Sequence, residues 1–150
     1  CEQLSNLYQR QKRTEELVKQ ETLLRELFDS FPAGMATFDK EDRLSLFNQD
    51  FADLNKEFSE LIVPNTEFSE LVTAAAYSGQ IVGAIGCEQD WIKERIELHK
   101  HGYNGIEREY SNGRFIRISE IPMASSGTIG IWSDITELKK NEKRTYQNYN

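Results

Sequence analysis

The chain has 150 residues, which is enough for one domain of ordinary size with helical extensions. Its 18 basic and 25 acidic residues give a net charge of −7, which argues against nucleic-acid binding because such binding depends on neutralising phosphates. Two cysteines make no disulfide framework, and neither a leader peptide nor a membrane-spanning run is visible, so we expect a cytoplasmic location without membrane contact in this fragment. Because the chain opens on Cys1 rather than Met, we expect a piece of a longer protein.

The first 31 residues contain no Gly or Pro and are rich in Glu, Gln, Lys, Arg and Leu, which predicts one long helix over residues 2–30. Apolar residues follow two weak heptad stripes, and the charged residues around them leave little apolar surface for a globular core. We therefore expect a parallel homodimer through this helix; the alternative is an amphipathic helix that packs on its own domain. The expected dimer contacts are Leu17, Leu24, Phe28 and Phe31.

Changes of composition divide the chain into three parts. The predicted amphipathic or coiled-coil helix occupies 1–31. The segment 32–136 holds all 9 glycines, all 3 prolines, and 9 basic against 17 acidic residues, as expected of a compact mixed domain. The segment 137–150 is rich in Lys and Glu, which predicts the start of a C-terminal linker helix.

Short strands and helices are predicted in the first half of the middle segment. Met35–Asp39 and Leu44–Asn48 are apolar runs on either side of a charged turn, which predicts a hairpin. Asn48 is a suitable N-cap for the helix that follows it. Apolar residues at helical spacing then predict helices over Glu67–Tyr77 and Glu88–His101.

The pattern changes to a period of two after Gly102, which predicts three further strands. These are Ile106–Tyr110, Arg114–Met123 and Thr128–Asp134, and the dipeptide 112–113 (Asn-Gly) is the strongest hairpin signal in the chain. Sequential strands form an antiparallel meander, and the first hairpin has to join the same sheet to bury its apolar face. The predicted fold class is therefore α+β, with one sheet and helices gathered on one side.

Four stretches of the sequence resemble PAS domains, the common sensory modules of bacterial signalling proteins. Residues 31–39 and 43–48 resemble the first two strands of that family, 112–118 its long fourth strand, and 128–136 its last strand with a terminal Asp-Ile-Thr. The resemblance implies a PAS-like five-stranded antiparallel sheet of order 2-1-5-4-3, with helices on one face that enclose a small cavity. It also implies a flanking helix that dimerises.

The segment Glu88–His101, with its Trp, Arg and His, resembles a helix of one PAS subfamily found beside histidine kinase and diguanylate cyclase domains. The resemblance therefore implies a sensory or relay domain of a larger bacterial protein, for example in a two-component system. A small-molecule or upstream-helix signal would pass to a C-terminal output such as a histidine kinase or a diguanylate cyclase. The alternative is a ligand-free dimerisation or spacer module.

A cavity between helices and sheet would be lined by residues that the helical and strand spacings turn inward. Trp91 and Arg95 lie one turn apart on one helix face, and an arginine beside an aromatic wall suits an anionic ligand. The alternative, which we favour, is that Arg95 pairs with Asp90, Glu94 or a strand glutamate at the surface. The candidate pocket residues are Phe51, Leu54, Phe68, Leu71, Trp91, Arg95, Ile116, Ile118, Ile131 and Ser133.

The residues Asp134, Ile135 and Thr136 form the expected signal-relay stretch. Asp134 precedes a helix-forming run, so its carboxylate can accept hydrogen bonds from the first helical turn, and Glu137 completes a capping-box spacing. The same geometry would serve a simple helix cap or a lever that transmits movement of the sheet. The family resemblance favours the lever.

Residues suited to catalysis or to metal binding are sparse. No serine lies in a Gly-x-Ser-x-Gly elbow and no phosphate-binding loop occurs, so we expect no enzymatic activity from this segment itself. Glu107 and Glu109 share one strand face, and we interpret them as solvent-facing rather than as a catalytic pair. His99 and His101 would point in different directions from a helix, so no metal is predicted.

No cofactor is predicted either. Haem bound through His99 as an axial ligand is disfavoured, and we interpret His99 as a half-buried, hydrogen-bonded side chain. Flavin is disfavoured because the sequence around Cys87 departs from the reactive-cysteine stretch of flavin-binding PAS photosensors. We interpret Cys87 as a small hydrophobe suited to burial.

Overall fold

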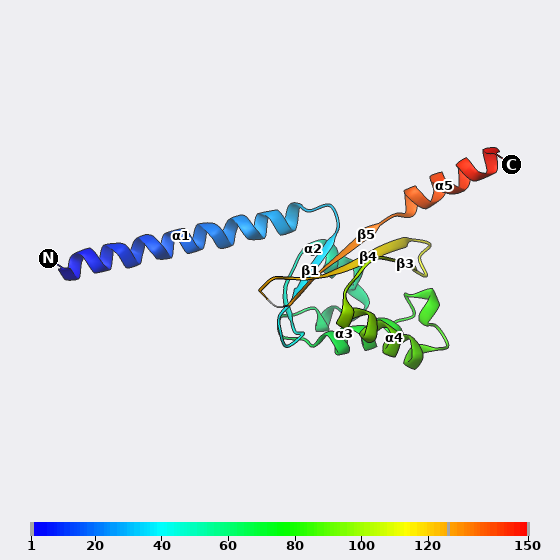
Figure 1. Ribbon diagram of the computed structural model, residues 1–150, viewed down its shortest axis with the longest axis horizontal. Coiled ribbons are helices and arrows are strands. Elements are labelled where there is room, and N and C mark those ends of the chain that lie inside the picture. The colour runs from blue at the N-terminus through cyan, green and yellow to red at the C-terminus, as the bar shows by residue number, and fades with distance from the viewer. Residues whose placement is uncertain (1, 126, 150) are drawn as a thin grey trace. The chain divides into compact units, whose positions relative to one another are not determined.

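The computed structural model describes residues 2–125 and 127–149, so Cys1 lies outside the described residues (Figure 1). The chain divides into two compact units, the first ending at Phe31 and the second beginning at Pro32. The elements in chain order are α1 (Glu2–Ser30), β1 (Gly34–Phe38), β2 (Leu44–Phe47), α2 (Gln49–Leu54), the 3-10 helix η1 (Lys56–Leu61), α3 (Phe68–Tyr77), the 3-10 helix η2 (Val82–Ala84), α4 (Glu88–His101), β3 (Tyr103–Glu109), β4 (Phe115–Pro122), β5 (Thr128–Asp134) and α5 (Thr136–Tyr149).

Helix α1 confirms the predicted long N-terminal helix, with 29 residues from Glu2 to Ser30. None of the residues of α1 is buried. No helix among the described residues is both long enough and apolar enough to cross a membrane. The exposed apolar residues of this first unit are Leu4, Leu7, Tyr8, Leu17, Val18, Leu23, Leu24, Leu27 and Phe31.

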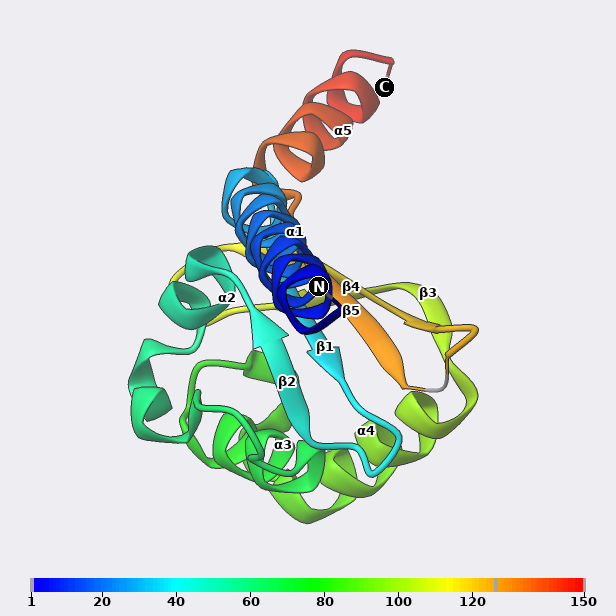
Figure 2. The same ribbon diagram turned by 90° about the vertical axis from the view of Figure 1, so that its left-hand side faces the viewer.

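The second unit contains one five-stranded sheet of order β2-β1-β5-β4-β3, as predicted. Every neighbouring pair of strands is antiparallel. Figure 2 shows β2, β1 and β5 side by side, with α3 and α4 on one side of them. The chain returns from β3 through β4 to β5 as a meander, and the hairpin of β1 and β2 then completes the sheet beside β5.

The face of the sheet toward the helices, called the inner face below, carries the core. Side chains alternate along a strand, so Ile116 and Ile118 of β4 point inward together, as does Trp132 of β5, the cross-strand neighbour of Ile118. Phe38 of β1 joins them and packs edge-on against Phe68 of α3, with ring centroids 5.2 Å apart. The other buried apolar residues of this cluster are Ala36, Leu44, Phe51, Phe58, Ile62, Leu71, Val72, Ala76, Ile81, Ala84, Trp91 and Tyr110.

The predicted cap at Asn48 fixes the start of α2. Its Oδ1 accepts a hydrogen bond from the N–H of Phe51 at 3.0 Å, which satisfies a donor of the first turn. The same oxygen accepts from the N–H of Met35 at 2.9 Å, and its Nδ2 donates to the carbonyl of Ala33 at 2.8 Å. One buried amide therefore holds α2 to the beginning of β1.

Strand β3 begins at Tyr103, three residues earlier than the predicted Ile106. The reason is a break in the alternation at Gly105, where φ is +86° and the pairing with β4 shifts register between Asn104 and Ile106. Such a bulge inserts an unpaired residue, so the two-residue period in the sequence becomes visible only after it.

Candidate functional site

One face of α4 combines an aromatic, a cationic and a titratable side chain. Trp91, Arg95 and His99 are spaced four residues apart, so they lie on one side of the helix, and all three are buried. Arg95 is 4% exposed and His99 is 5% exposed. Buried charges in proteins are paired, so this face requires acidic partners on the element that it covers.

Glu120 of β4 supplies the first partner. It continues the inward alternation of Ile116 and Ile118 and is 0% exposed. Its cross-strand neighbours are Tyr103 on β3 and Gly130 on β5. Gly130 has no side chain, and the ring of Trp132 lies over it, beside Glu120 in the same row of the inner face.

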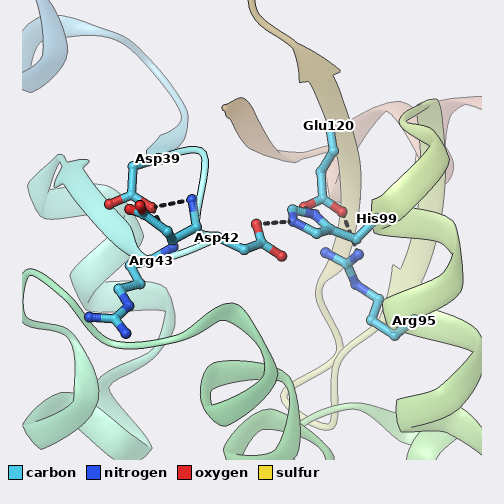
Figure 3. A network of polar contacts seen from close by, with 7 residues as sticks. Asp39, Asp42, Arg43, Arg95, His99 and Glu120 are labelled. Carbon is cyan, nitrogen blue, oxygen red and sulfur yellow. Dashed lines mark hydrogen bonds and ion pairs between the residues drawn. The ribbon is translucent and has the colours of Figure 1, made fainter. Parts of the chain in front are cut away.

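Four side chains form a connected set that we call the ionic network: Asp42, Arg95, His99 and Glu120 (Figure 3). Arg95 Nη1 donates to Glu120 Oε1. The Nδ1 of His99 lies 2.5 Å from the other oxygen of Glu120, and its Nε2 lies 2.6 Å from Asp42 Oδ1. The histidine ring thus connects β4 on one side to the turn between β1 and β2 on the other.

The backbone of that turn places Asp42. The residue has a positive φ of 63°, which aspartate tolerates better than most residues. Its N–H donates to the carbonyl of Asp39 at 2.9 Å, and its carbonyl accepts from the N–H of Phe68 at 2.9 Å. The Oδ1 of Asp39 accepts from the N–H of Arg43 at 3.0 Å and stiffens the turn further (Figure 3).

Aromatic rings enclose the cations of the network. Phe68 stacks on His99 with centroids 3.5 Å apart and planes 10° from parallel, and Phe38 meets the same imidazole edge-on at 5.7 Å. The guanidinium of Arg95 lies 5.1 Å from the Phe68 ring centroid and 5.3 Å from that of Tyr103. Such contacts favour a cation electrostatically while they exclude water.

The electrostatics of the network favour the ionised form of Glu120 and the protonated form of His99. Burial raises the pKa of Glu120, but hydrogen bonds and charge from His99 and Arg95 outweigh it and set the pKa below its ordinary value. Burial lowers the pKa of His99, but the hydrogen bonds to Asp42 and Glu120 prevail and set it above its ordinary value.

A small interior cavity of about 50 Å³ lies beside the network. That volume accommodates on the order of one or two water molecules. Six of the ten candidate pocket residues line it: Phe51, Phe68, Leu71, Trp91, Arg95 and Ile118. Trp132, which the sequence analysis did not include, lines it as well.

Two strand residues expected at the pocket lie on the other face of the sheet. Ile131 and Ser133 flank Trp132 along β5, and Trp132 points inward to Phe51 with ring centroids 4.8 Å apart. Because successive side chains alternate, Ile131 and Ser133 point outward. The expectation that these two residues line the pocket is therefore wrong by one residue, because Trp132 between them is the side chain that points inward.

A larger, open cavity of about 500 Å³ lies at the end of the sheet where β5 leaves toward α5. It is lined by the other two candidates, Leu54 and Ile116, and by Asp134 of the expected relay stretch. Trp132 and Tyr110 contribute apolar surface to it. The interior and end cavities therefore share the Trp132 side chain as a wall.

Asp134 joins the last strand to the last helix. Its Oδ1 accepts hydrogen bonds from the N–H of Thr136 at 2.9 Å and from the hydroxyl of the same residue at 2.5 Å. The Thr136 hydroxyl oxygen accepts in turn from the N–H of Phe115 at 3.0 Å, and Arg114 Nη1 donates to Asp134 Oδ2 at 3.2 Å. Two neighbouring strands, β4 and β5, are thus bonded to the first residue of α5.

The structure changes three interpretations of single side chains. Arg95 does pair with a strand glutamate, but in the interior and not at the surface. His99 is fully buried rather than half-buried. Cys87 is exposed rather than buried, and its Sγ donates to the carbonyl of Gly83 at 3.2 Å.

Sequence reasoning missed Glu120 and Asp42 as partners. Glu120 carried a usable signal, since it keeps the phase of Ile116 and Ile118 and so predicts a buried acid facing a basic helix. Asp42 carried none, because it lies in a charged turn and its contact with His99 spans 57 residues of sequence.

A family model described as the PAS fold matches residues 28–143. Among solved structures, the chain is similar to the phage VqmA-DPO complex, with 18% identity, a TM-score of 0.55, and coverage of 91% of this chain and 62% of that one. It is also similar to the PAS domain of an HTR-like protein from Haloarcula marismortui, with 15% identity, coverage of 83% and 99%, and a TM-score of 0.49. A comparison with curated proteins finds no match.

A further similar structure is a domain of a sensory box sensor histidine kinase/response regulator from Geobacter sulfurreducens, with 20% identity, coverage of 81% of this chain and 99% of that one, and a TM-score of 0.48. The first of these likenesses shows a shared fold. The chain spans less than two thirds of the phage VqmA chain that it matches.

Proposed function

The chain belongs to the PAS family, and from that premise we propose that it is a sensory and relay domain of a larger bacterial signalling protein. It receives a signal and passes it through Asp134, Ile135 and Thr136 to α5 and to an output that follows, such as a histidine kinase or a diguanylate cyclase. The domain performs no chemical step in this proposal, and its working location is the cytoplasm.

The observation that carries the proposal is the junction between β5 and α5. Asp134 binds both the backbone and the hydroxyl of Thr136, and the same hydroxyl is bound to Phe115 of β4. A shift of β5 against β4 therefore has to move or break the first turn of the helix. A cap that served α5 alone would need no bond to a second strand.

The input has two possible routes in this proposal. A small molecule can occupy the end cavity of about 500 Å³, which lies within the range of ligand sites and has Asp134 in its wall. A signal can also arrive along α1, which leads directly into β1 at Pro32. An anionic ligand held by Arg95 is less well supported, because Glu120 already occupies that guanidinium.

We also propose that α1 pairs with α1 of a second copy in a parallel homodimer. Leu17, Leu24 and Phe31 repeat every seven residues and are exposed, as a coiled-coil stripe requires. A second candidate function follows from the same stripe: a ligand-free dimerisation or spacer module, in which α1 sets the oligomeric state.

Native mass spectrometry of the whole chain tests these readings. We expect a dimer that carries an additional small mass, which would support the sensor. A dimer of bare chains favours the spacer or an input through α1, and a monomer contradicts the pairing of α1. The variant Leu17→Glu with Leu24→Glu should yield a monomer, whereas Glu15→Gln with Glu16→Gln, which removes charge and leaves the stripe intact, should remain dimeric.

A further inference from the structure

We propose that the ionic network is a proton-binding site centred on His99, and that the proton is a signal that this domain detects. The inference deepens the proposed sensory function and rests on it for its biological meaning. The proton site itself rests on the contacts around one imidazole ring.

Both ring nitrogens of His99 lie within hydrogen-bond distance of a carboxylate oxygen, at 2.5 Å for Glu120 and 2.6 Å for Asp42. An ionised carboxylate can only accept, and a neutral imidazole has one N–H donor. The two contacts can therefore be hydrogen bonds at the same time only when the ring carries both protons. With both carboxylates ionised, these two distances fit the imidazolium.

The charges of the groups that face His99 from the surrounding elements cancel only when the ring is protonated. Asp42 comes from the turn between β1 and β2, Glu120 from β4, and Arg95 from the same helix. Tyr103 of β3 lies near Glu120, and burial raises the pKa of its phenol, so it stays neutral. With His99 protonated, two positive charges meet two negative charges; without the proton, one carboxylate is left in excess.

The two carboxylates respond differently to loss of the proton. The side chain of Glu120 is 0% exposed and keeps Arg95 as a partner, so it needs the remaining N–H of the ring. The side chain of Asp42 is 49% exposed and can exchange its contact for water. Deprotonation therefore leaves a lone pair of Nε2 facing the Asp42 carboxylate, and it releases the turn from α4.

The released turn follows β1, which pairs with β5, the strand that leads into α5. Phe38, the last residue of β1 before the turn, is paired with Thr128 at the start of β5. The end of β5 carries Asp134, which is bonded to α5. The opposite end of β1 follows α1 in the chain, so a movement of this hairpin acts on the strand that follows α1 and, through its pairing with β5, on the strand that precedes α5.

The direction in which the pKa of His99 is shifted agrees with the proposed proton site. Burial alone would lower it, but the hydrogen bonds to Asp42 and Glu120 raise it above the ordinary value of 6.5. The proton is thus held to a higher pH than on an ordinary histidine, and it is lost as the pH rises further. Histidine is the residue whose charge changes in this physiological range after modest shifts.

The test is a titration of the whole chain labelled with ¹⁵N, followed through the ring nitrogens of His99 and the backbone amides. We expect two ring N–H groups at pH 6.5, a midpoint above that value, and a change of the Asp42 and Arg43 amides at the same midpoint. Asp42→Asn should lower the midpoint, since it removes the charge and asparagine also tolerates positive φ. Asp39→Asn, a matched change in the same turn, should leave the midpoint unchanged.

Three other outcomes are decisive. A single ring N–H at pH 6.5, or a ring that keeps both protons over the whole range in which the domain is folded, overturns the proton site while the proposed relay function stands. A His99 midpoint that Asp42→Asn does not shift also overturns it. A titration that opens the turn but leaves the amides of α5 unchanged keeps the proton site and contradicts the relay through Asp134.

Discussion

The inner face of the sheet has two halves of opposite character. Over β1 and β5 it is aromatic, with Phe38 packed against Phe68 of α3 and Trp132 packed against Phe51 of α2. Over β3 and β4 it is ionic, because α4 brings Arg95 and His99 onto Glu120. The ring of Phe68 touches both halves, since it packs against Phe38 and stacks on His99.

The two halves differ in how they tolerate change. Contacts in the aromatic half are non-directional, so a smaller ring or an aliphatic side chain loses contact area and little else. In the ionic half each charge depends on a specific partner in a site with little water, and removal of one partner leaves the others unpaired. The aromatic half therefore supports the fold, whereas the ionic half makes it sensitive to a single group.

The largest effect is expected for Glu120→Gln. The substitution keeps the shape of the side chain but leaves the cations Arg95 and His99 without their buried counter-charge. Breaking a buried pair in this way costs about 3–5 kcal/mol of the free energy of unfolding. Urea denaturation monitored by Trp fluorescence measures it.

Glu109→Gln is the matched control for that change. Glu109 is an exposed residue of β3, so the same substitution should alter the free energy of unfolding by no more than about 0.5 kcal/mol. Equal losses for the two variants would contradict the contrast between the ionic half and the surface.

The pH dependence of stability should come from the ionic half. Because the pKa of His99 is raised from 6.5, its contribution is complete below pH 6.5 and is lost as the pH rises through the raised value. Because the pKa of Glu120 is lowered from 4.5, its contribution is complete above pH 4.5 and is lost as the pH falls through the lowered value. Maximal stability is expected between these limits.

Thermal melting across the pH range measures this profile. The variant His99→Gln removes the titrating ring, so its melting temperature should no longer decline on the alkaline side. His101→Gln changes a neighbouring exposed histidine, and it should keep the decline. A wild-type melting temperature that rises from neutral to alkaline pH would contradict the predicted loss of the contribution of His99.

A smaller effect is expected in the aromatic half from Phe51→Leu. Phe51 lies in the core against Trp132 at 4.8 Å, and leucine fills most of its space without leaving a polar group unpaired. The loss should be about 1 kcal/mol, near the centre of the range for single substitutions. The difference in urea midpoint between this variant and wild type should be the same at pH 5 and at pH 6.5, since the substitution removes no charge.

The same contrast explains what the sequence could predict. The three-strand meander follows from alternation and turn residues, and α1 follows from helix formers without Gly or Pro, whereas the sheet order was implied only by the resemblance to PAS domains. Trp91 and Arg95 were placed on one face from helical spacing, because a common face is a local property of α4, whereas His99 was interpreted only as a half-buried, hydrogen-bonded side chain. Their packing partners depend on contacts across the fold, which periodicity does not report.

Two misses show the limit in physical terms. Ile131 and Ser133 were the pocket candidates on β5, but Trp132 between them points inward, and its ring lies over Gly130, which has no side chain. Asp42 belongs to a turn whose charged residues look alike in the sequence. Only the fold brings one of them to His99, so this contact of the ionic network could not have been derived from spacing, whereas Glu120 shares the strand phase of Ile116 and Ile118.

The smallest effect is expected for Arg114→Gln, and it completes the comparison because Arg114 and Asp134 form the same kind of ion pair as Arg95 and Glu120. The side chains of this pair are 57% and 44% exposed, so water can solvate either charge when the other is removed. Exposed pairs contribute about 0–1 kcal/mol, and the loss should lie in that range. Raising the salt concentration should erase the difference from wild type, since exposed pairs are screened. If Arg114→Gln instead cost as much as Glu120→Gln, burial would not be what separates the two pairs, and the arginine at the β5–α5 junction would itself be a structural requirement of the relay.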